Sequence, residues 1–345
     1  MGKSLDFTPH DTRWIPCSAR FVCSGITSSG KGALTIYELS QGDLKITLDC
    51  PTARSQGIKC TTFGASRLEE RNLAMGDYGG GLTIRDLERA TNADKDTSPG
   101  DVFSVNAHDG IINSIDGIGG TSIGHGAPEL VTGGRDGCVR VWDPRVNHPV
   151  VCLEPEEGTS RRDCWSVAFG DSHNDMERCV CAGYDNGDVK LFDLRNNSLR
   201  WETNCRNGVT CVQFDRPDIE MNKLVVTTLE SKFRCYDMRT RHKEDGFSSL
   251  SERAHRSTVW LGRHLPQNRD IFMTGGGNGG FNIYKYHYPI NRVKKHSKDS
   301  APIGVVGSVE LLNSRVISTQ PIISFDWSPD REGLCCLGCL DQTLR

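Results

Sequence analysis

A short phrase that recurs along the chain constrains the fold more than any other feature of the sequence. Each copy has an apolar pair, small residues, a turn with Asp or Asn and Gly, alternating apolar residues and an aromatic residue, often followed by Asp. The clearest copies are residues 130–143, 180–193 and 224–237. Weaker copies end at Tyr37, Arg85 and Tyr284, and a seventh begins at Leu334. Seven copies of one phrase predict seven copies of one structural unit.

The phrase is typical of β-strands joined by hairpins. Its apolar and polar residues alternate with the period of a strand rather than that of a helix. Asp136-Gly137, Asn186-Gly187 and Asn278-Gly279 are hairpin-turn dipeptides, because these residues tolerate positive φ. The copies recur about every 50 residues, near the ~40–45-residue period of a WD repeat lengthened by loops. One copy makes only a small sheet, so the sheets must pack against each other in a ring.

We therefore predict an all-β chain that forms a single seven-bladed WD-repeat β-propeller over residues 1–345. The sequence stops at Arg345, within the third strand of the last blade. We therefore expect that blade to be incomplete and the closure of the ring to be affected. The approximate blade limits are residues 13–39, 57–87, 108–143, 162–194, 207–238, 255–312 and 319–345.

The composition argues against several classes of protein. Hydrophobic residues make up 36% and charged residues 25%, which is typical of a folded, soluble protein. The net charge of -3 provides no basic field for nucleic acid or a membrane surface, and no apolar run is long enough to span a bilayer. The 15 cysteines come without a secretory signal, so we expect reduced thiols and a cytoplasmic location. We expect no metal ion and no other cofactor, because no metal-ligand spacing is present.

The third repeat contains a full set of residues that form one hydrogen-bonded chain in WD repeats: His108, Thr132, Asp136 and Trp142. The sixth repeat has a variant of it: His255, Thr274, Asn278 and Tyr284. His, Asp and Thr together suggest a catalytic triad, but here the Asp lies in a hairpin turn and the set ends on an indole. We interpret both sets as structural networks that order a blade. No nucleophile has an obvious base, so we expect no enzymatic activity.

Loops and strand starts remain as the surface for partner proteins. Two segments, which lead into the fourth and sixth blades, combine Trp with Arg, and both residue types are common anchors of interfaces. The candidate protein-binding residues are Arg162, Asp163, Trp165, Arg256 and Trp260. Ordinary core packing is the alternative for both tryptophans.

Several stretches outside the repeat pattern resemble one WD-repeat family, Monad (WD repeat-containing protein 92). They cover nearly the whole chain: residues 112–120, 126–133, 162–170, 180–187, 200–203, 264–269 and 311–329. The resemblance implies a cytoplasmic adaptor in the preassembly of axonemal dyneins. It also implies work with a co-chaperone complex of RuvB-like ATPases and prefoldin-like subunits, stabilisation of dynein heavy chains for cilia, and a link to apoptosis. The chain departs from the family before Trp14, where it is shorter, and at its end.

Two other functions stay open. Aromatic-Asp-x-Arg endings at Asp143 with Arg145 and at Asp193 with Arg195 are similar to the box that docks substrate receptors on the adaptor of cullin-RING ubiquitin ligases. The same Asp and Arg can instead pair locally. A reader of peptide or methyl-lysine histone tails would need an aromatic cage. With 7% aromatic residues, we cannot place three around one point.

Overall fold

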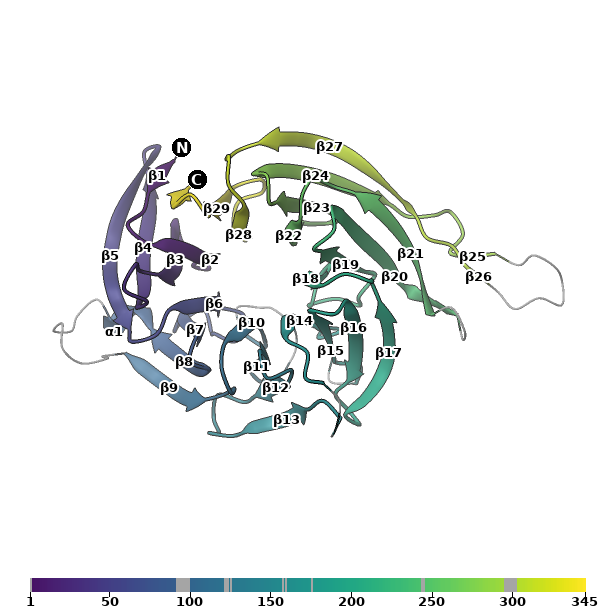
Figure 1. Cartoon of the computed structure of the whole chain (residues 1–345), viewed down its shortest axis with the longest axis horizontal. Coiled ribbons are helices and arrows are strands. Elements are labelled where there is room, and N and C mark those ends of the chain that lie inside the picture. Colours follow the sequence, from purple (N-terminus) through teal and green to yellow (C-terminus); the bar gives the residue numbers. More distant parts are fainter. Residues whose placement is uncertain are drawn as a thin grey trace.

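The computed structural model describes residues 2–90, 100–120, 124, 126–156, 158, 160–174, 176–242, 246–294 and 303–345. Seven four-stranded antiparallel sheets form a ring around a central channel, which confirms the predicted seven-bladed propeller (Figure 1). The one helix in the described residues is the short α1 (Leu87–Ala90). Among these residues, no helix has the length and apolar character needed to cross a membrane.

In the first four blades the strands follow one another from the channel outward. Blade 1 contains β2 (Thr8–Trp14), β3 (Arg20–Ile26), β4 (Gly32–Ser40) and β5 (Asp43–Arg54). Blade 2 contains β6 (Ile58–Thr62), β7 (Asn72–Asp77), β8 (Gly81–Asp86) and β9 (Asp101–Asn106). Blade 3 contains β10 (Ile112–Ile118), β11 (Glu129–Gly134), β12 (Val139–Trp142) and β13 (Pro149–Leu153). Blade 4 contains β14 (Cys164–Gly170), β15 (Cys179–Tyr184), β16 (Asp188–Asp193) and β17 (Ser198–Asn204).

The next two blades have the same order of strands, and blade 6 carries an insertion between its outer two strands. Blade 5 contains β18 (Val209–Phe214), β19 (Lys223–Thr228), β20 (Lys232–His242) and β21 (Gly246–Arg253). Blade 6 contains β22 (Val259–Leu265), β23 (Asn268–Gly276), β24 (Gly280–His287) and β27 (Ser308–Val316). The connection from β24 to β27 includes a separate strand pair, β25 (Val293–Lys294) and β26 (Ile303–Gly304), which projects from the ring at the right of Figure 1.

Blade 7 closes the ring with strands from both ends of the chain. It contains β28 (Ile322–Trp327), β29 (Cys335–Cys339), β30 (Thr343–Leu344) and β1 (Lys3–Ser4). Lys3 pairs with Leu344 and Ser4 with Thr343, so the two termini lie side by side (Figure 1). The expectation of an incomplete last blade is therefore corrected: all four strands are present. The outer two have only 2 residues each.

The hydrophobic core is divided among the seven interfaces between blades. Each of the seven buried apolar clusters combines side chains from two neighbouring blades. At the closing seam, for example, Phe7 and Trp14 of the N-terminal segment pack with Cys336 and Leu344 of blade 7. A single small sheet would expose one such face to water, so the blades stabilise each other. Of the cysteines whose side chains the structure describes, all except Cys17, Cys152 and Cys335 are buried.

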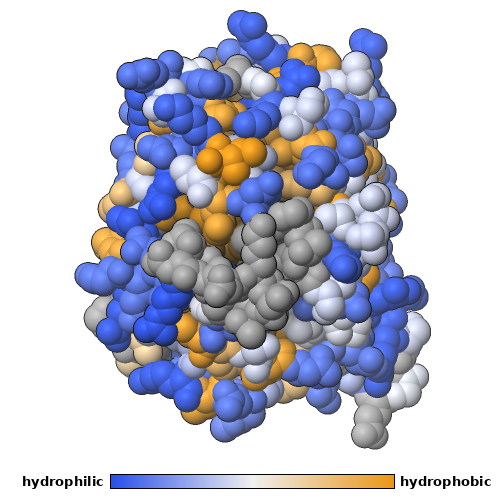
Figure 2. All heavy atoms as spheres, turned by 90° about the vertical axis from the view of Figure 1, so that its left-hand side faces the viewer, coloured by the Kyte–Doolittle hydropathy of each residue, from blue (hydrophilic) through white to orange (hydrophobic). Residues whose placement is uncertain are grey.

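The outer wall of the ring is polar by comparison. Figure 2 shows the side around β5, where hydrophilic side chains separate small apolar patches. Single exposed apolar residues such as Ile46 on β5 are ordinary on a protein surface.

Candidate protein-binding site at the mouth of the channel

Every innermost strand of the propeller has an irregularity near its start. The pairing with the next strand skips one residue there, which is a β-bulge. A bulge turns the side chain of the skipped residue in a new direction. All seven skipped residues line the same cavity in the channel, and we call them the bulge residues: His10, Lys59, Asn113, Trp165, Thr210, Trp260 and Ile323.

A buried apolar residue precedes the bulge in six of the seven blades. These preceding residues are fully buried between blades: Ile58, Ile112, Cys164, Val209, Val259 and Ile322. In a regular strand the next side chain would point to the opposite face of the sheet. The bulge directs it toward the axis of the ring, so the bulge residues form the mouth of the channel.

Polar side chains tie the inner strands of neighbouring blades together. The Ser114 hydroxyl accepts the backbone N–H of Val167 at 3.1 Å, and the Ser166 hydroxyl accepts that of Val212 at 3.0 Å. Both serines directly follow a bulge residue. Similar bonds to backbone N–H groups are made by Asp11 to Thr61, Asp116 to Phe169, Gln213 to His264 and Asp326 to Trp14. The channel wall is therefore held by side chains where no sheet ladder runs between blades.

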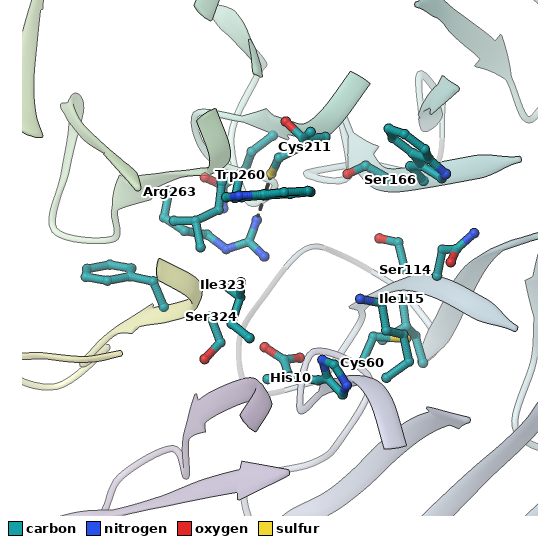
Figure 3. Close-up of a pocket in the computed structure, with 18 of the residues that line it drawn as sticks. His10, Cys60, Ser114, Ile115, Ser166, Cys211, Trp260, Arg263, Ile323 and Ser324 are labelled. Carbon is teal, nitrogen blue, oxygen red and sulfur yellow. Dashed lines mark hydrogen bonds between the residues drawn. The ribbon is translucent and has the colours of Figure 1, made fainter. Parts of the chain in front are cut away.

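The cavity behind the mouth has a volume of about 500 Å³ and contains charged groups (Figure 3). Arg13 pairs with Asp11 at 3.2 Å and lies 3.9 Å from Asp326. Burial alone would lower the pKa of Arg13, but these carboxylates raise it above its ordinary value. Burial raises the pKa of Asp326 to about 6, although Arg13 acts in the opposite direction. Burial also raises the pKa of Asp116.

Arg263 is the second guanidinium group of this cavity, and it has no carboxylate partner among the described residues. Its Nη1 donates to the thiol of Cys211 at 3.4 Å and to the carbonyl oxygen of Gly262 at 3.5 Å. Its Nε is buried without a hydrogen-bond acceptor. Figure 3 shows Arg263 extending from β22 toward the opening, on the same side as Trp260.

The mouth carries an apolar patch on blades 4 to 6, which we call the mouth patch: Trp165, Leu229 and Trp260. Trp260 is 39% exposed, Leu229 is 37% exposed and Trp165 is half-buried. Gly208 makes room for two of them, since a Cβ there would lie 2.7 Å from Cζ3 of Trp165 and 3.1 Å from Cδ1 of Leu229. Both tryptophans lie at the channel rather than inside a blade interface. Neither indole N–H donates to a residue that the structure describes.

Arginines surround this patch. Arg162, Arg206 and Arg256 lie in the segments that lead into β14, β18 and β22, and all three are exposed. None of them forms an ion pair with a described residue. Asp163 is half-buried, and its carbonyl oxygen accepts the backbone N–H of Asp185 at 3.0 Å. The residues that the sequence proposes for protein binding therefore gather at one end of the ring.

In blade 3 the structure joins the residues of the predicted network. Thr132 Oγ1 lies 2.7 Å from Nε2 of His108 and accepts the indole N–H of Trp142 at 2.9 Å. Nδ1 of His108 lies 2.9 Å from Asp136, which also accepts from Nη1 of Arg140 at 2.9 Å. Burial alone would raise the pKa of Asp136, but the bonds from His108 and Arg140 hold it below its ordinary value. All four predicted members are buried, so they form a hydrogen-bond network inside the blade.

In blade 6 the variant set is connected differently. Nε2 of His255 lies 2.8 Å from Oγ1 of Thr274, as in blade 3. The hydroxyl of Tyr284 accepts from Asn282 at 3.0 Å, and hydrogen bonds with Asn282 and Thr274 oppose the rise in its pKa that burial causes. Asn278 accepts the hydroxyl of Ser257 at 3.3 Å. The same Asn278 oxygen accepts the backbone N–H of Gly280 at 3.3 Å, so Asn278 bonds to its own turn and to the segment before β22.

The two aromatic-Asp-x-Arg endings lie at the end of the blades away from the mouth. In blade 3, for example, β12 begins with Val139 near the mouth and ends with Trp142, which pairs with Leu130 at the far end of β11. Nε of Arg145 donates to Asp143 at 2.8 Å and Nη2 at 2.6 Å. Arg195 makes the same two-pronged contact with Asp193. Both arginines remain exposed, at 72% and 51% of their side chains. Each Asp and Arg thus pair locally, which was the alternative to adaptor docking.

No protein-family model matches the chain. Curated relatives do match it, and they share the name Dynein axonemal assembly factor 10. The Xenopus laevis protein is 56% identical over 344 residues, which are 99% of this chain and 93% of the relative. The Homo sapiens protein is 55% identical with the same coverage. The Chlamydomonas reinhardtii protein is 53% identical over 348 residues, which are 100% of this chain and 94% of the relative. The chain belongs to the dynein axonemal assembly factor 10 family.

Membership of the dynein axonemal assembly factor 10 family confirms the part of the resemblance that concerns dynein assembly factors. The names of the relatives contain neither Monad nor WD repeat. The co-chaperone partners that the resemblance implies therefore stay predictions.

For this member of the dynein axonemal assembly factor 10 family, sequence reasoning selected Trp165 and Trp260 but missed the other five bulge residues, Leu229 and Arg263. A signal was present, because six of the seven bulge residues directly follow the first apolar residue of an inner strand. In the described parts of the chain, no three or more His, Cys, Asp or Glu side chains are grouped to hold a metal ion.

Proposed function

We propose that the chain is a scaffold that holds other proteins during the assembly of axonemal dyneins and catalyses no reaction. Two findings support this proposal. Relatives at 53% to 56% identity over nearly the full chain are named as dynein axonemal assembly factors. The propeller presents a rigid ring whose mouth offers side chains suited to protein contacts.

The mouth patch is the observation that carries the binding role. Trp and Arg dominate the energetics of many protein interfaces, because they bury large areas and bond in several directions. Here Trp165 and Trp260 are directed at a cavity of about 500 Å³ instead of a blade interface. A cavity of that size lies in the range of ~300–1,000 Å³ that is common for ligand sites.

The same cavity offers little to a catalyst. The hydroxyls of Ser114 and Ser166 already accept backbone N–H groups. Burial raises the pKa of the Cys60 thiol, so it stays protonated and is a poor nucleophile. His10, the imidazole at the mouth, has a pKa lowered to about 3 by burial and by Lys59, far from that of a general base at neutral pH.

The partners belong to the same proposal. By family resemblance they are dynein heavy chains and a co-chaperone complex of RuvB-like ATPases and prefoldin-like subunits. The place of the interaction is the cytoplasm, before dyneins reach the cilium. Neither nucleic acid nor a membrane is a partner, in line with the net charge of -3.

Affinity purification of the tagged chain from a ciliated cell tests the proposal. We expect the wild-type chain to recover dynein heavy chains and RuvB-like ATPases, and the double variant Trp165→Ala with Trp260→Ala to lose them. Arg145→Ala, at the opposite end of the blades, is the matched control and should recover them as wild type does. Recovery of neither class by a folded wild-type bait would contradict the proposal. Equal recovery by the double Trp variant would move the site away from the mouth.

A further inference from the structure

We propose that the mouth of the channel binds an extended acidic segment of a partner protein. Apolar side chains of this segment pack on the mouth patch, and its Asp and Glu side chains pair with the arginines around and inside the mouth. The arginines are Arg162, Arg206, Arg256 and Arg263. The inference rests on the proposed scaffold function and adds the chemical class of the partner.

The mouth patch provides the apolar part of this site. Trp165 lies against Gly208, next to Leu229. The backbone of Leu229 is held in turn, because its carbonyl oxygen accepts the hydroxyl of Thr258 at 3.1 Å, two residues before Trp260. The three apolar side chains therefore follow one another across blades 4, 5 and 6. This arc suits an extended chain, whose alternate side chains point to the same side.

The charge of the surrounding residues selects an acidic partner. Two exposed arginines at the other end of the blades have local partners: Arg145 pairs with Asp143 and Arg195 with Asp193. Arg162, Arg206 and Arg256 form no ion pair within the described residues. Arg162 attracts the nearby carboxylate of Asp185 without forming an ion pair with it. All three guanidinium groups can take carboxylates of a partner in two-pronged contacts, which are the strong form of this interaction.

Inside the cavity, Arg263 also favours an acidic partner. A thiol is a weak hydrogen-bond acceptor, and the carbonyl contact to Gly262 is long. Asp116 and Asp326 attract Arg263 electrostatically, but they form no ion pair with it among the described residues and accept backbone N–H groups of neighbouring strands. A guanidinium that is largely removed from water is costly unless it is paired. Figure 3 shows Arg263 next to Trp260. A carboxylate of the partner that enters the cavity at this point would satisfy Arg263.

The distribution of charge favours a peptide over a nucleic acid. Asp163, Asp185 and Glu230 lie among the arginines and would repel a continuous phosphate backbone. A peptide can place carboxylates only where arginines lie. It must also supply several of them, because the four arginines belong to blades 4, 5 and 6. An internal acidic segment can do this, whereas a chain terminus contributes a single carboxylate.

Binding of synthetic peptides to the purified full chain tests this inference. The probe is a short labelled peptide of alternating Glu and Phe with both ends blocked, and fluorescence anisotropy measures its affinity. A peptide with Lys in place of Glu and an oligothymidine are compared with it. We expect the Glu peptide to bind most tightly, and added salt to weaken it. Trp260→Ala and Arg263→Gln should each reduce its affinity about tenfold or more, whereas Arg145→Gln should leave it unchanged.

Arg256→Gln provides a second test, since this exposed side chain can change without affecting the fold. Equal affinity for the Glu and Lys peptides, tighter binding of the oligothymidine, or unchanged affinity in both Arg256→Gln and Arg263→Gln would overturn the inference. The purification experiment above separates this result from the scaffold function. If the wild-type chain still recovers dynein heavy chains and the double variant Trp165→Ala with Trp260→Ala still loses them, only the acidic character of the partner is wrong.

Discussion

Replacing Thr132 by Val isolates the contribution of the hydrogen-bond network in blade 3. The two side chains have nearly the same shape, so the change removes a hydroxyl without creating a cavity. It deprives two buried groups of their partner, Nε2 of His108 and the indole N–H of Trp142, at 2.7 and 2.9 Å. An unsatisfied buried polar group costs about 1–3 kcal/mol, so the free energy of unfolding should fall by about 2–6 kcal/mol. Urea unfolding followed by tryptophan fluorescence measures it.

Thr274→Val in blade 6 is the matched control. Thr274 is bonded to His255 at 2.8 Å and also to Tyr284, but Tyr284 keeps the bond from Asn282, so the loss should be smaller than that of Thr132→Val. In a background that already carries Trp142→Phe, Thr132→Val should cost about 1–3 kcal/mol less, because the indole donor is gone. If Thr132→Val costs no more than Thr274→Val, and the two blade 3 changes are additive, then the network does not stabilise the blade as argued.

Acid should destabilise the propeller. Burial lowers the pKa of His255 and His264, so below pH ~6.5 the unfolded chain takes up protons that the folded chain refuses. The free energy of unfolding should therefore fall as the pH falls, by up to about 1.4 kcal/mol per pH unit for each histidine. A free energy of unfolding, measured with urea, that does not change with pH would contradict this. Gly279 has a φ of 71°, and a Cβ added there would collide with the carbonyl oxygen of Ser318, so Gly279→Ala should lower the melting temperature far more than Gly30→Ala, which has open space around it. Arg145→Ala combined with Arg195→Ala should hardly affect stability, and loss of a ubiquitin-ligase adaptor from a pull-down with this variant would support the ligase alternative.

The repeat phrase predicts the blades because it is a local signal. Each turn dipeptide, such as Asp136-Gly137, must reverse the chain within two residues, and Gly137 does so with φ 79. The network of blade 3 is nearly as local, because Thr132 and Trp142 lie on paired neighbouring strands. Residues of this kind can be placed from sequence alone.

The closing seam and the full mouth depend on contacts between distant parts of the chain. Lys3 pairs with Leu344, and no pattern around either residue shows that they meet. His10 and Ile323 reach the same cavity only because the ring closes between blades 7 and 1. The sequence also does not show that Arg263 lacks an ion-pair partner. Asp116 and Asp326 are close enough in space to be candidate partners, but they accept backbone N–H groups instead.

On the inner strands, different residues hold the ring together and contact a partner protein. The residue after the bulge, as in Ser114 and Ser166, bonds to the neighbouring blade and cannot change freely. Some bulge residues share this work, since Thr210 donates to the carbonyl oxygen of Val259. Trp165 and Trp260 make no such bond to a described residue. Their substitution should therefore alter recognition more than stability, which is why the two tryptophans are the appropriate residues for testing the mouth as a binding site.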